Sequence, residues 1–81
     1  MREFEDLDGV RWETGVSERE SPDYKGRFHL TMRSEATGEV VELTDVRWNS
    51  RRTAERTLDT MSVVELRRRL RSARGRARQR V

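Results

Sequence analysis

The spacing of the apolar residues changes along this chain, and that change constrains the fold more than any single motif does. Up to residue 43 apolar side chains recur at alternate positions, whereas after residue 50 they recur at every third or fourth position. The first spacing is typical of strands with one buried face, and the second is typical of amphipathic helices. The sequence therefore predicts an α+β fold in which helices follow and cover a sheet.

Three strands are expected in the first half, over residues 10–16, 27–33 and 39–43. In the middle strand the alternation predicts that Phe28, Leu30 and Met32 face the core and that His29 faces the solvent. A short connection ending in Gly38, which can adopt a positive φ, leads into the third strand. We therefore predict a three-stranded antiparallel β-meander.

Two helices are expected in the second half. The first is predicted to begin after Asn49 or Ser50, either of which can cap it. Ser62 and Glu65 fit a capping box, so the second helix should begin directly after Ser62. Because a small sheet cannot bury its apolar side alone, both C-terminal helices should pack on one sheet face.

Residues 10–81 are thus predicted to form a single small α+β domain with a basic C-terminal helix and tail. Residues 1–9 are expected to be an acidic arm that frays or docks weakly. A core of the expected size is marginal for a monomer, which favours a homodimer. Its predicted members, with the three supporting residues last, are Val10, Trp12, Val16, Phe28, Leu30, Met32, Val41, Leu43, Leu58, Met61, Leu66, Leu70, Val46, Ala54 and Val63.

Charge is divided between the two halves of the chain. Residues 1–45 carry 6 basic and 12 acidic side chains, whereas residues 46–81 carry 12 basic and 3 acidic ones. Of the 18 basic residues 17 are arginine, whose planar guanidinium suits phosphate and carboxylate groups. A GC-rich genome also produces arginine bias, but codon bias does not sort acids from bases.

Three interpretations of the arginine-rich half remain open. In the first, a small non-enzymatic binding protein contacts the phosphates of DNA or RNA. In the second, the arginines meet an acidic protein surface, either in a partner of a small regulatory or accessory protein or in a homodimer. The third is a solvated helix face. The residues expected to contact nucleic acid are Arg47, Trp48, Arg51, Arg52, Arg56, Arg67, Arg68, Arg71, Arg74 and Arg78.

Trp48 has two expected roles. It either stacks on a base at the centre of the basic segment or fills the gap between the third strand and the first helix.

Other function classes find little support in the sequence. With no cysteine, one histidine and scattered glycines, we expect no catalytic residue, no metal site and no cofactor. The longest apolar runs are two residues, so no membrane association is expected. No apolar leader run stands at the N-terminus, and a soluble cytoplasmic protein is the expectation.

Overall fold

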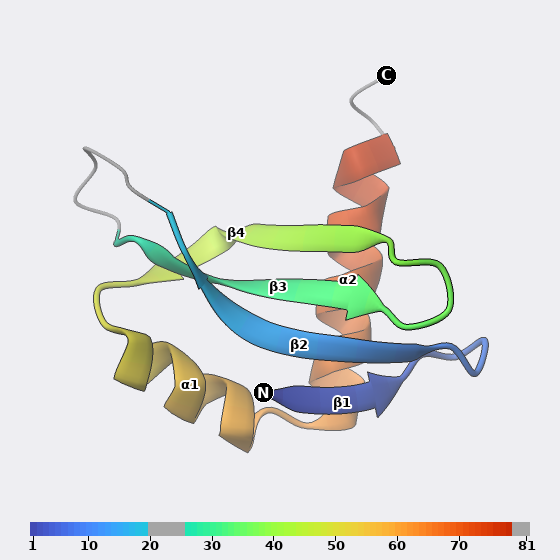
Figure 1. The fold of residues 1–81 in the computed structure, drawn as a ribbon, viewed down its shortest axis with the longest axis horizontal. Coiled ribbons are helices and arrows are strands. Elements are labelled where there is room, and N and C mark those ends of the chain that lie inside the picture. The colour runs from blue at the N-terminus through green and yellow to red at the C-terminus, as the bar shows by residue number, and fades with distance from the viewer. Residues whose placement is uncertain (20–25, 79–81) are drawn as a thin grey trace.

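The structure, a computed structural model, describes residues 1–19 and 26–78, with side chains up to residue 75. In this part of the chain an antiparallel sheet of four strands is followed by two helices. The strands lie in chain order as β1 (Arg2–Glu5), β2 (Arg11–Glu18), β3 (Phe28–Ser34) and β4 (Val40–Trp48). The helices are α1 (Arg51–Thr60) and α2 (Val63–Arg78) (Figure 1). The predicted α+β class is therefore confirmed.

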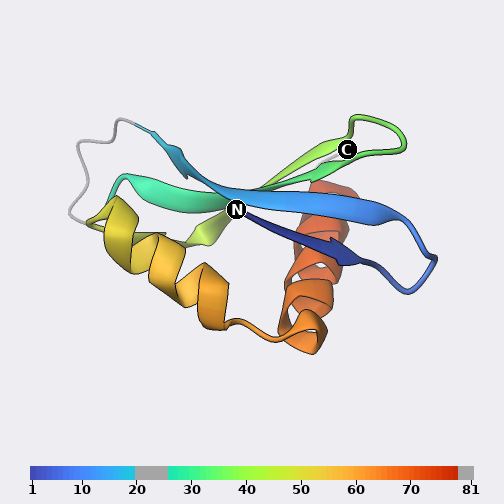
Figure 2. The same ribbon diagram turned by 60° about the horizontal axis from the view of Figure 1, so that its bottom comes forward.

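Both helices lie on the same face of the sheet (Figure 2). α1 packs against β2, β3 and β4, while α2 crosses the strands and contacts β4 and β1. No described helix covers the opposite side of the sheet, which we call the open face. Neither helix is long and apolar enough to cross a bilayer, within the residues that the structure describes.

The strand that the sequence-based prediction lacks is β1, which lies inside the segment expected to be an acidic arm. Its pairing with β2 puts Phe4 opposite Trp12, and Phe4 is only 5% exposed. The guanidinium of Arg2 donates to the carbonyls of Leu58 and Met61, where α1 ends. The prediction of three strands is therefore wrong, because these two side chains dock an otherwise acidic segment on the fold.

Most of the predicted core is buried, and Phe4 and Ala73 join it. Val10 and Val16 only pack partly buried against the core, and Phe28 is half-buried. Val46 and Val63, expected to support the core, are 36% and 37% exposed. The predicted members that are buried are Trp12, Leu30, Met32, Val41, Leu43, Ala54, Leu58, Met61, Leu66 and Leu70.

A register shift in the β3–β4 pairing explains why strict alternation fails near residue 46. Phe28 lies opposite Trp48, but Leu30 lies opposite Leu43, so residues 44–47 face a single residue of β3. Such an irregularity re-aims side chains on the longer strand. It also extends β4 to Trp48, beyond the predicted end at Leu43.

His29 is the residue of β3 that lies at this shift. It is 2% exposed, so the prediction that it faces the solvent is wrong. Its Nε2 lies 3.4 Å from Oε1 of Glu42, and its Nδ1 has no hydrogen-bond partner among the described residues. A bulged pairing changes which side chains are covered, and the period of the sequence contains no sign of it.

The helix starts follow the predicted caps. Oγ of Ser50 accepts the backbone N–H of Thr53 at 3.2 Å, so Ser50 rather than Asn49 caps α1. Oγ of Ser62 accepts the N–H of Glu65 at 3.1 Å at the start of α2. Each bond satisfies a donor that the first turn of a helix leaves unpaired.

Candidate nucleic-acid interface

Helix α2 presents two ridges at the spacing that 3.6 residues per turn produces. The inner ridge is buried against the sheet and consists of Leu66, Leu70 and Ala73. The outer ridge is exposed and consists of Val64, Arg68, Arg71 and Gly75. The predicted C-terminal arginine cluster therefore flanks a buried apolar seam, and one side of it faces outward.

A groove lies between α2 and the turn that joins β1 to β2. Its volume is about 450 Å³, within the range of small-ligand sites. Three arginines from successive turns of α2 line one side, and one acidic side chain lies opposite them. We call this the α2 groove, and its lining residues are Leu7, Asp8, Arg67, Arg71, Arg74 and Gly75.

Two of the groove arginines are held by contacts with the sheet half of the chain. Nε of Arg67 donates to the carbonyl oxygen of Glu5 at 2.8 Å. Nη2 of Arg74 donates to Oε1 of Glu39 at 3.3 Å, and its guanidinium lies 5.5 Å from the ring centroid of Trp12. These contacts fix both guanidinium groups, since a hydrogen bond and a cation–π contact each restrict a long side chain.

Arg71 lies between them on the helix and is exposed. Among the described residues it has no hydrogen bond or ion pair. Like charges three or four residues apart on a helix destabilise it by a few tenths of a kcal/mol each. Arg71 is therefore a cation between two neighbouring cations, and an anion in the groove would relieve their repulsion.

The other wall of the groove depends on Asp6. Oδ1 of Asp6 accepts the backbone N–H groups of Asp8 and Val10 at 2.9 Å each, and Oδ2 accepts Nε1–H of Trp12 at 2.9 Å. Burial alone raises the pKa of Asp6, but these hydrogen bonds and the nearby charge of Arg74 outweigh it. The pKa of Asp6 is therefore lowered from its ordinary value of 3.8.

The opposite side of α2 is more nearly neutral. Glu65 pairs with Arg68 at 3.6 Å and with Arg69 at 3.0 Å. These two arginines, with Leu43, Asp45 and Ser72, line a smaller cavity of about 150 Å³ beside β4. The excess of positive charge on α2 therefore lies toward the α2 groove.

The predicted contact residues of β4 and α1 lie away from this groove. Arg51 donates to the carbonyl oxygen of Val16 at 3.4 Å, and its guanidinium lies 5.5 Å from the Phe28 ring centroid. Trp48 lies opposite Phe28 and packs partly buried against the core. None of the predicted residues of this segment lines the α2 groove, namely Arg47, Trp48, Arg51, Arg52 and Arg56.

The two sets of arginines are therefore at opposite ends of the sheet. Arg51 and Trp48 lie where β2 ends and β3 begins, whereas the groove lies where β1 ends and β2 begins (Figure 1). Arg78 belongs to the last turn of α2, but its side chain lies outside the described residues.

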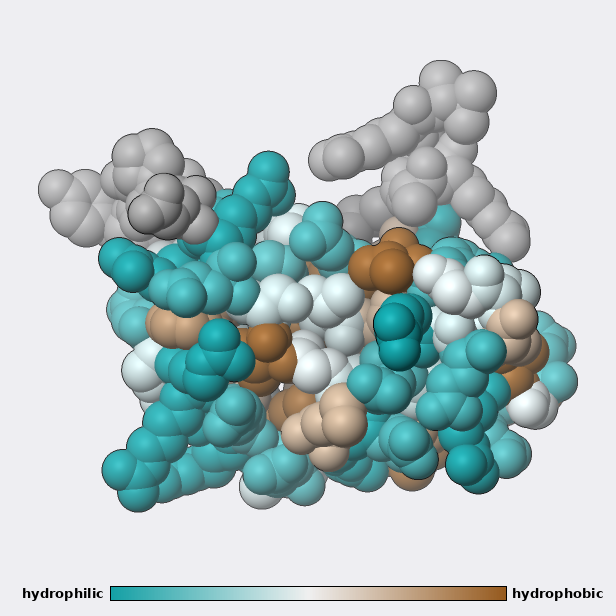
Figure 3. All heavy atoms as spheres, in the orientation of Figure 1, coloured by the Kyte–Doolittle hydropathy of each residue, from teal (hydrophilic) through white to brown (hydrophobic). Residues whose placement is uncertain are grey.

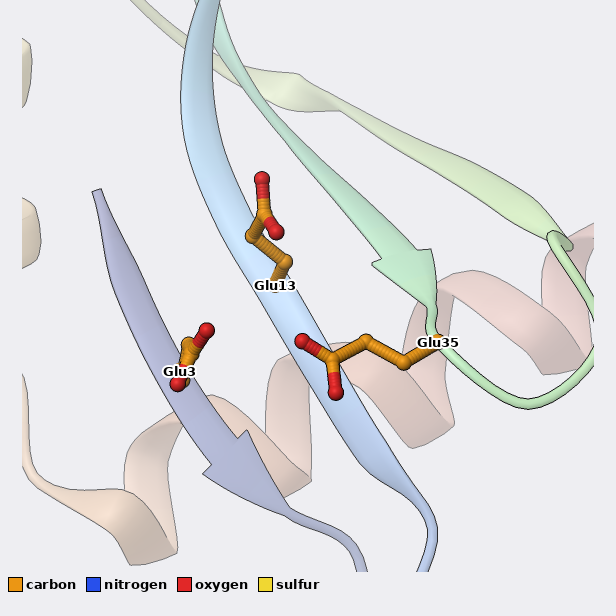
Figure 4. Close-up of side chains that lie close together, drawn as sticks. All are labelled: Glu3, Glu13 and Glu35. Atoms are coloured by element: carbon orange, nitrogen blue, oxygen red, sulfur yellow. The ribbon is translucent and has the colours of Figure 1, made fainter.

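Acidic side chains gather on the open face instead. One carboxylate oxygen from each of Glu3, Glu13 and Glu35 lies within 4.8 Å of the other two (Figure 4). They come from β1, β2 and the β3–β4 connection. Viewed from this side, hydrophilic side chains cover most of the surface and apolar ones form separate small patches (Figure 3). Carboxylates alone could hold a hard cation, but no buried unpaired group among the described residues accompanies these three, and we assign no metal site.

Sequence reasoning missed both Leu7 and the acidic cluster, for the same reason. Each depends on β1, whose alternation of Arg2 and Phe4 with Glu3 and Glu5 is the one signal that could have revealed it. Once β1 is paired, Glu3 necessarily lies opposite Glu13.

Comparison of the chain with protein-family models, with curated proteins and with solved structures finds no match.

Proposed function

We propose that this protein is a non-enzymatic binding protein whose α2 groove holds the backbone phosphates of a nucleic acid. The observation that carries the proposal is the separation of charge across the fold. The groove arginines lie on the helix side of the sheet, whereas Glu3, Glu13 and Glu35 lie on the open face. A polyanion bound to α2 would therefore lie on the other side of the sheet from this glutamate cluster.

The groove arginines have the chemistry that phosphate binding requires. A guanidinium donates two parallel hydrogen bonds to a phosphate, and it keeps its charge at any physiological pH. Because Arg67 and Arg74 are already held by Glu5 and Glu39, they lose less side-chain entropy when a phosphate binds. Arg71 is free to complete the contact.

The outer ridge is also accessible. Ala73 is the last described residue of the core, and a Cβ built on Gly75 would meet nothing within 4 Å. Beyond Ala73 the helix therefore leaves the sheet, and Figure 1 shows it extending past β4. An exposed helix of this kind can lie against the sugar–phosphate backbone or enter a major groove.

Fluorescence anisotropy of labelled duplex DNA, single-stranded DNA and RNA, measured over a series of salt concentrations, tests the proposal. Binding should weaken linearly on a logarithmic scale as salt rises. Arg71→Gln should weaken binding to all sequences alike. It should also reduce the slope of the logarithm of the binding constant against the logarithm of salt concentration by about 1. Arg71 has no described partner, so the variant should fold normally.

Arg33→Gln is the matched control, because Arg33 is exposed on the open face and has no described ion pair. It removes the same charge and should leave the slope unchanged. No binding at low salt, or equal effects of the two variants, would contradict the proposal.

A second candidate function is the binding of an acidic protein surface. The observation that favours it is Leu7, which lines the groove and is 81% exposed. An apolar side chain beside arginines suits a peptide that contains both glutamate and leucine. Leu7→Ser should weaken binding of such a peptide, while leaving oligonucleotide binding unchanged.

A further inference from the structure

The open face has an excess of acidic groups that the chain does not neutralise. Arg11 is 4.0 Å from the carboxylates of Glu3 and Glu5, at the outer limit of an ion pair. Arg33 lies opposite Glu13 in the sheet, but no ion pair joins them. The acidic side chains of this face, which we call the acidic face, are Glu3, Glu5, Glu13, Glu35 and Glu42.

The sheet register forces this repulsion on the fold. Glu3 and Glu13 are directly opposite in the β1–β2 pair, and like charges at such positions destabilise a sheet. The carboxylate of Glu35 joins them from the β3–β4 connection (Figure 4). A cationic group from outside the molecule would therefore gain favourable interactions here.

The same chain carries cations that match this face but, among the described residues, form no ion pair with its carboxylates. Arg67, Arg71 and Arg74 lie in the helix layer, and the sheet separates them from the acidic face of their own molecule (Figure 2). They span roughly 10 Å along the helix, at about 1.5 Å per residue. Neighbouring strands are about 5 Å apart, so this stripe can cover three strands when α2 lies across the sheet.

We propose that the acidic face of one copy docks on the α2 groove of a second copy. Because the two surfaces lie on opposite sides of the molecule, the contact is head-to-tail and can continue from copy to copy. The acidic face then occupies the groove that the proposed function gives to phosphates. Self-association and nucleic-acid binding therefore exclude each other, and this last step alone depends on the proposed function.

Net charge makes the salt dependence diagnostic. Each copy carries a net charge of +3, so copies repel one another overall, and added salt would favour non-specific association. Association through complementary faces has the opposite dependence. Sedimentation velocity of the full chain should therefore show assemblies at low salt that dissociate to monomers as salt is raised.

Two variants test the acidic face and the α2 groove independently. Glu13→Lys with Glu35→Lys disrupts the acidic face and keeps the groove, whereas Arg71→Glu disrupts the groove and keeps the acidic face. Each should be largely monomeric alone, and their mixture should form a one-to-one complex that stops at two chains. The matched control is Glu55→Lys with Asp59→Lys, the same charge change at exposed positions of α1, which should still self-associate.

The outcomes are decisive in either direction. A wild-type chain that stays monomeric at low salt overturns the proposal, as does a mixture of the two variants that forms no complex. Assemblies that a chelator dissolves would show that a divalent cation joins two acidic faces, and assemblies that the control variant also loses would show a general charge effect. Self-association without oligonucleotide binding would leave this contact standing and remove the proposed function, whereas binding by a strictly monomeric chain would do the reverse.

Discussion

At the scale of single residues, Gly26 shows how closely two backbones approach in this fold. It precedes β3 with a φ of +92°, and a Cβ at this position would lie 2.4 Å from the carbonyl oxygen of Trp48. Neither backbone can move without shifting a strand. The sequence places a glycine here among turn residues, but it gives no sign that the constraint is a close approach to β4.

Gly26→Ala should therefore destabilise the protein by about 2–4 kcal/mol, combining a positive φ with a steric clash. Gly9→Ala is the matched control, because Gly9 has a φ of +81° and nothing within 4 Å of its Cβ position. Gly9→Ala should lower the free energy of unfolding by only about 1 kcal/mol. Chemical denaturation of both variants measures the difference in the free energy of unfolding. Equal decreases would mean that the backbone at Trp48 shifts to accommodate the added Cβ without cost.

At the scale of elements, the β1–β2 turn depends on one carboxylate. Asp6 accepts hydrogen bonds from Trp12, Val10 and Asp8, and its lowered pKa means that folding favours its ionised form. A carboxyl whose pKa is lower in the folded state stabilises the protein above its ordinary pKa, and this stabilisation disappears as pH falls through the lower value. The turn should therefore loosen below about pH 4.

Asp6→Asn should lower the free energy of unfolding by about 1 kcal/mol at neutral pH, since an amide places a donor against the indole N–H. The difference between wild type and variant should shrink as pH falls from about 4 through the lower pKa of folded Asp6, because the wild-type carboxyl takes up its proton over this range. Denaturation at a series of pH values measures it. Asp59→Asn, at an exposed position of α1, is the control. A difference that is constant with pH would show that the charge of Asp6 contributes nothing.

The elements also show how far a sequence of this kind can be interpreted. Helix starts were predictable because Ser50 and Ser62 act locally. Period alone also predicts the best-buried core positions of β2, β3 and the helices, namely Trp12, Leu30, Met32, Leu58, Leu66 and Leu70. The strand β1 was not predictable, because its one buried apolar side chain, Phe4, gains its stability from Trp12 across the sheet. The arginine stripe of α2 was predicted. The opposite wall of the α2 groove was not, because the β1–β2 turn forms it and β1 was not predicted.

At the scale of the whole molecule, charge is separated between the two layers rather than only between the two halves of the chain. In the part of the chain that the structure describes, the ion pair of Arg74 with Glu39 joins the helical half to the β3–β4 connection. On the open face the carboxylates of Glu3, Glu13 and Glu35 lie together, and along the groove side of α2 three arginines follow one another. Within each surface repulsion between like charges should therefore exceed attraction, and screening should favour the folded state.

Raising sodium chloride from about 0.02 M to about 0.5 M should consequently increase the free energy of unfolding, because the Debye length falls below the spacing of these charges. The measurement needs a protein concentration at which sedimentation shows only monomers, so that assembly does not contribute. Glu35→Gln should stabilise the chain at low salt by roughly 0.5 kcal/mol and reduce its response to salt, since it relieves repulsion with Glu3 and Glu13. Glu55→Gln on α1 removes the same charge away from the cluster and should change neither. Stability that falls with salt would mean that ion pairs such as Arg74–Glu39 outweigh the repulsion, and that the two charged surfaces stabilise the fold rather than strain it.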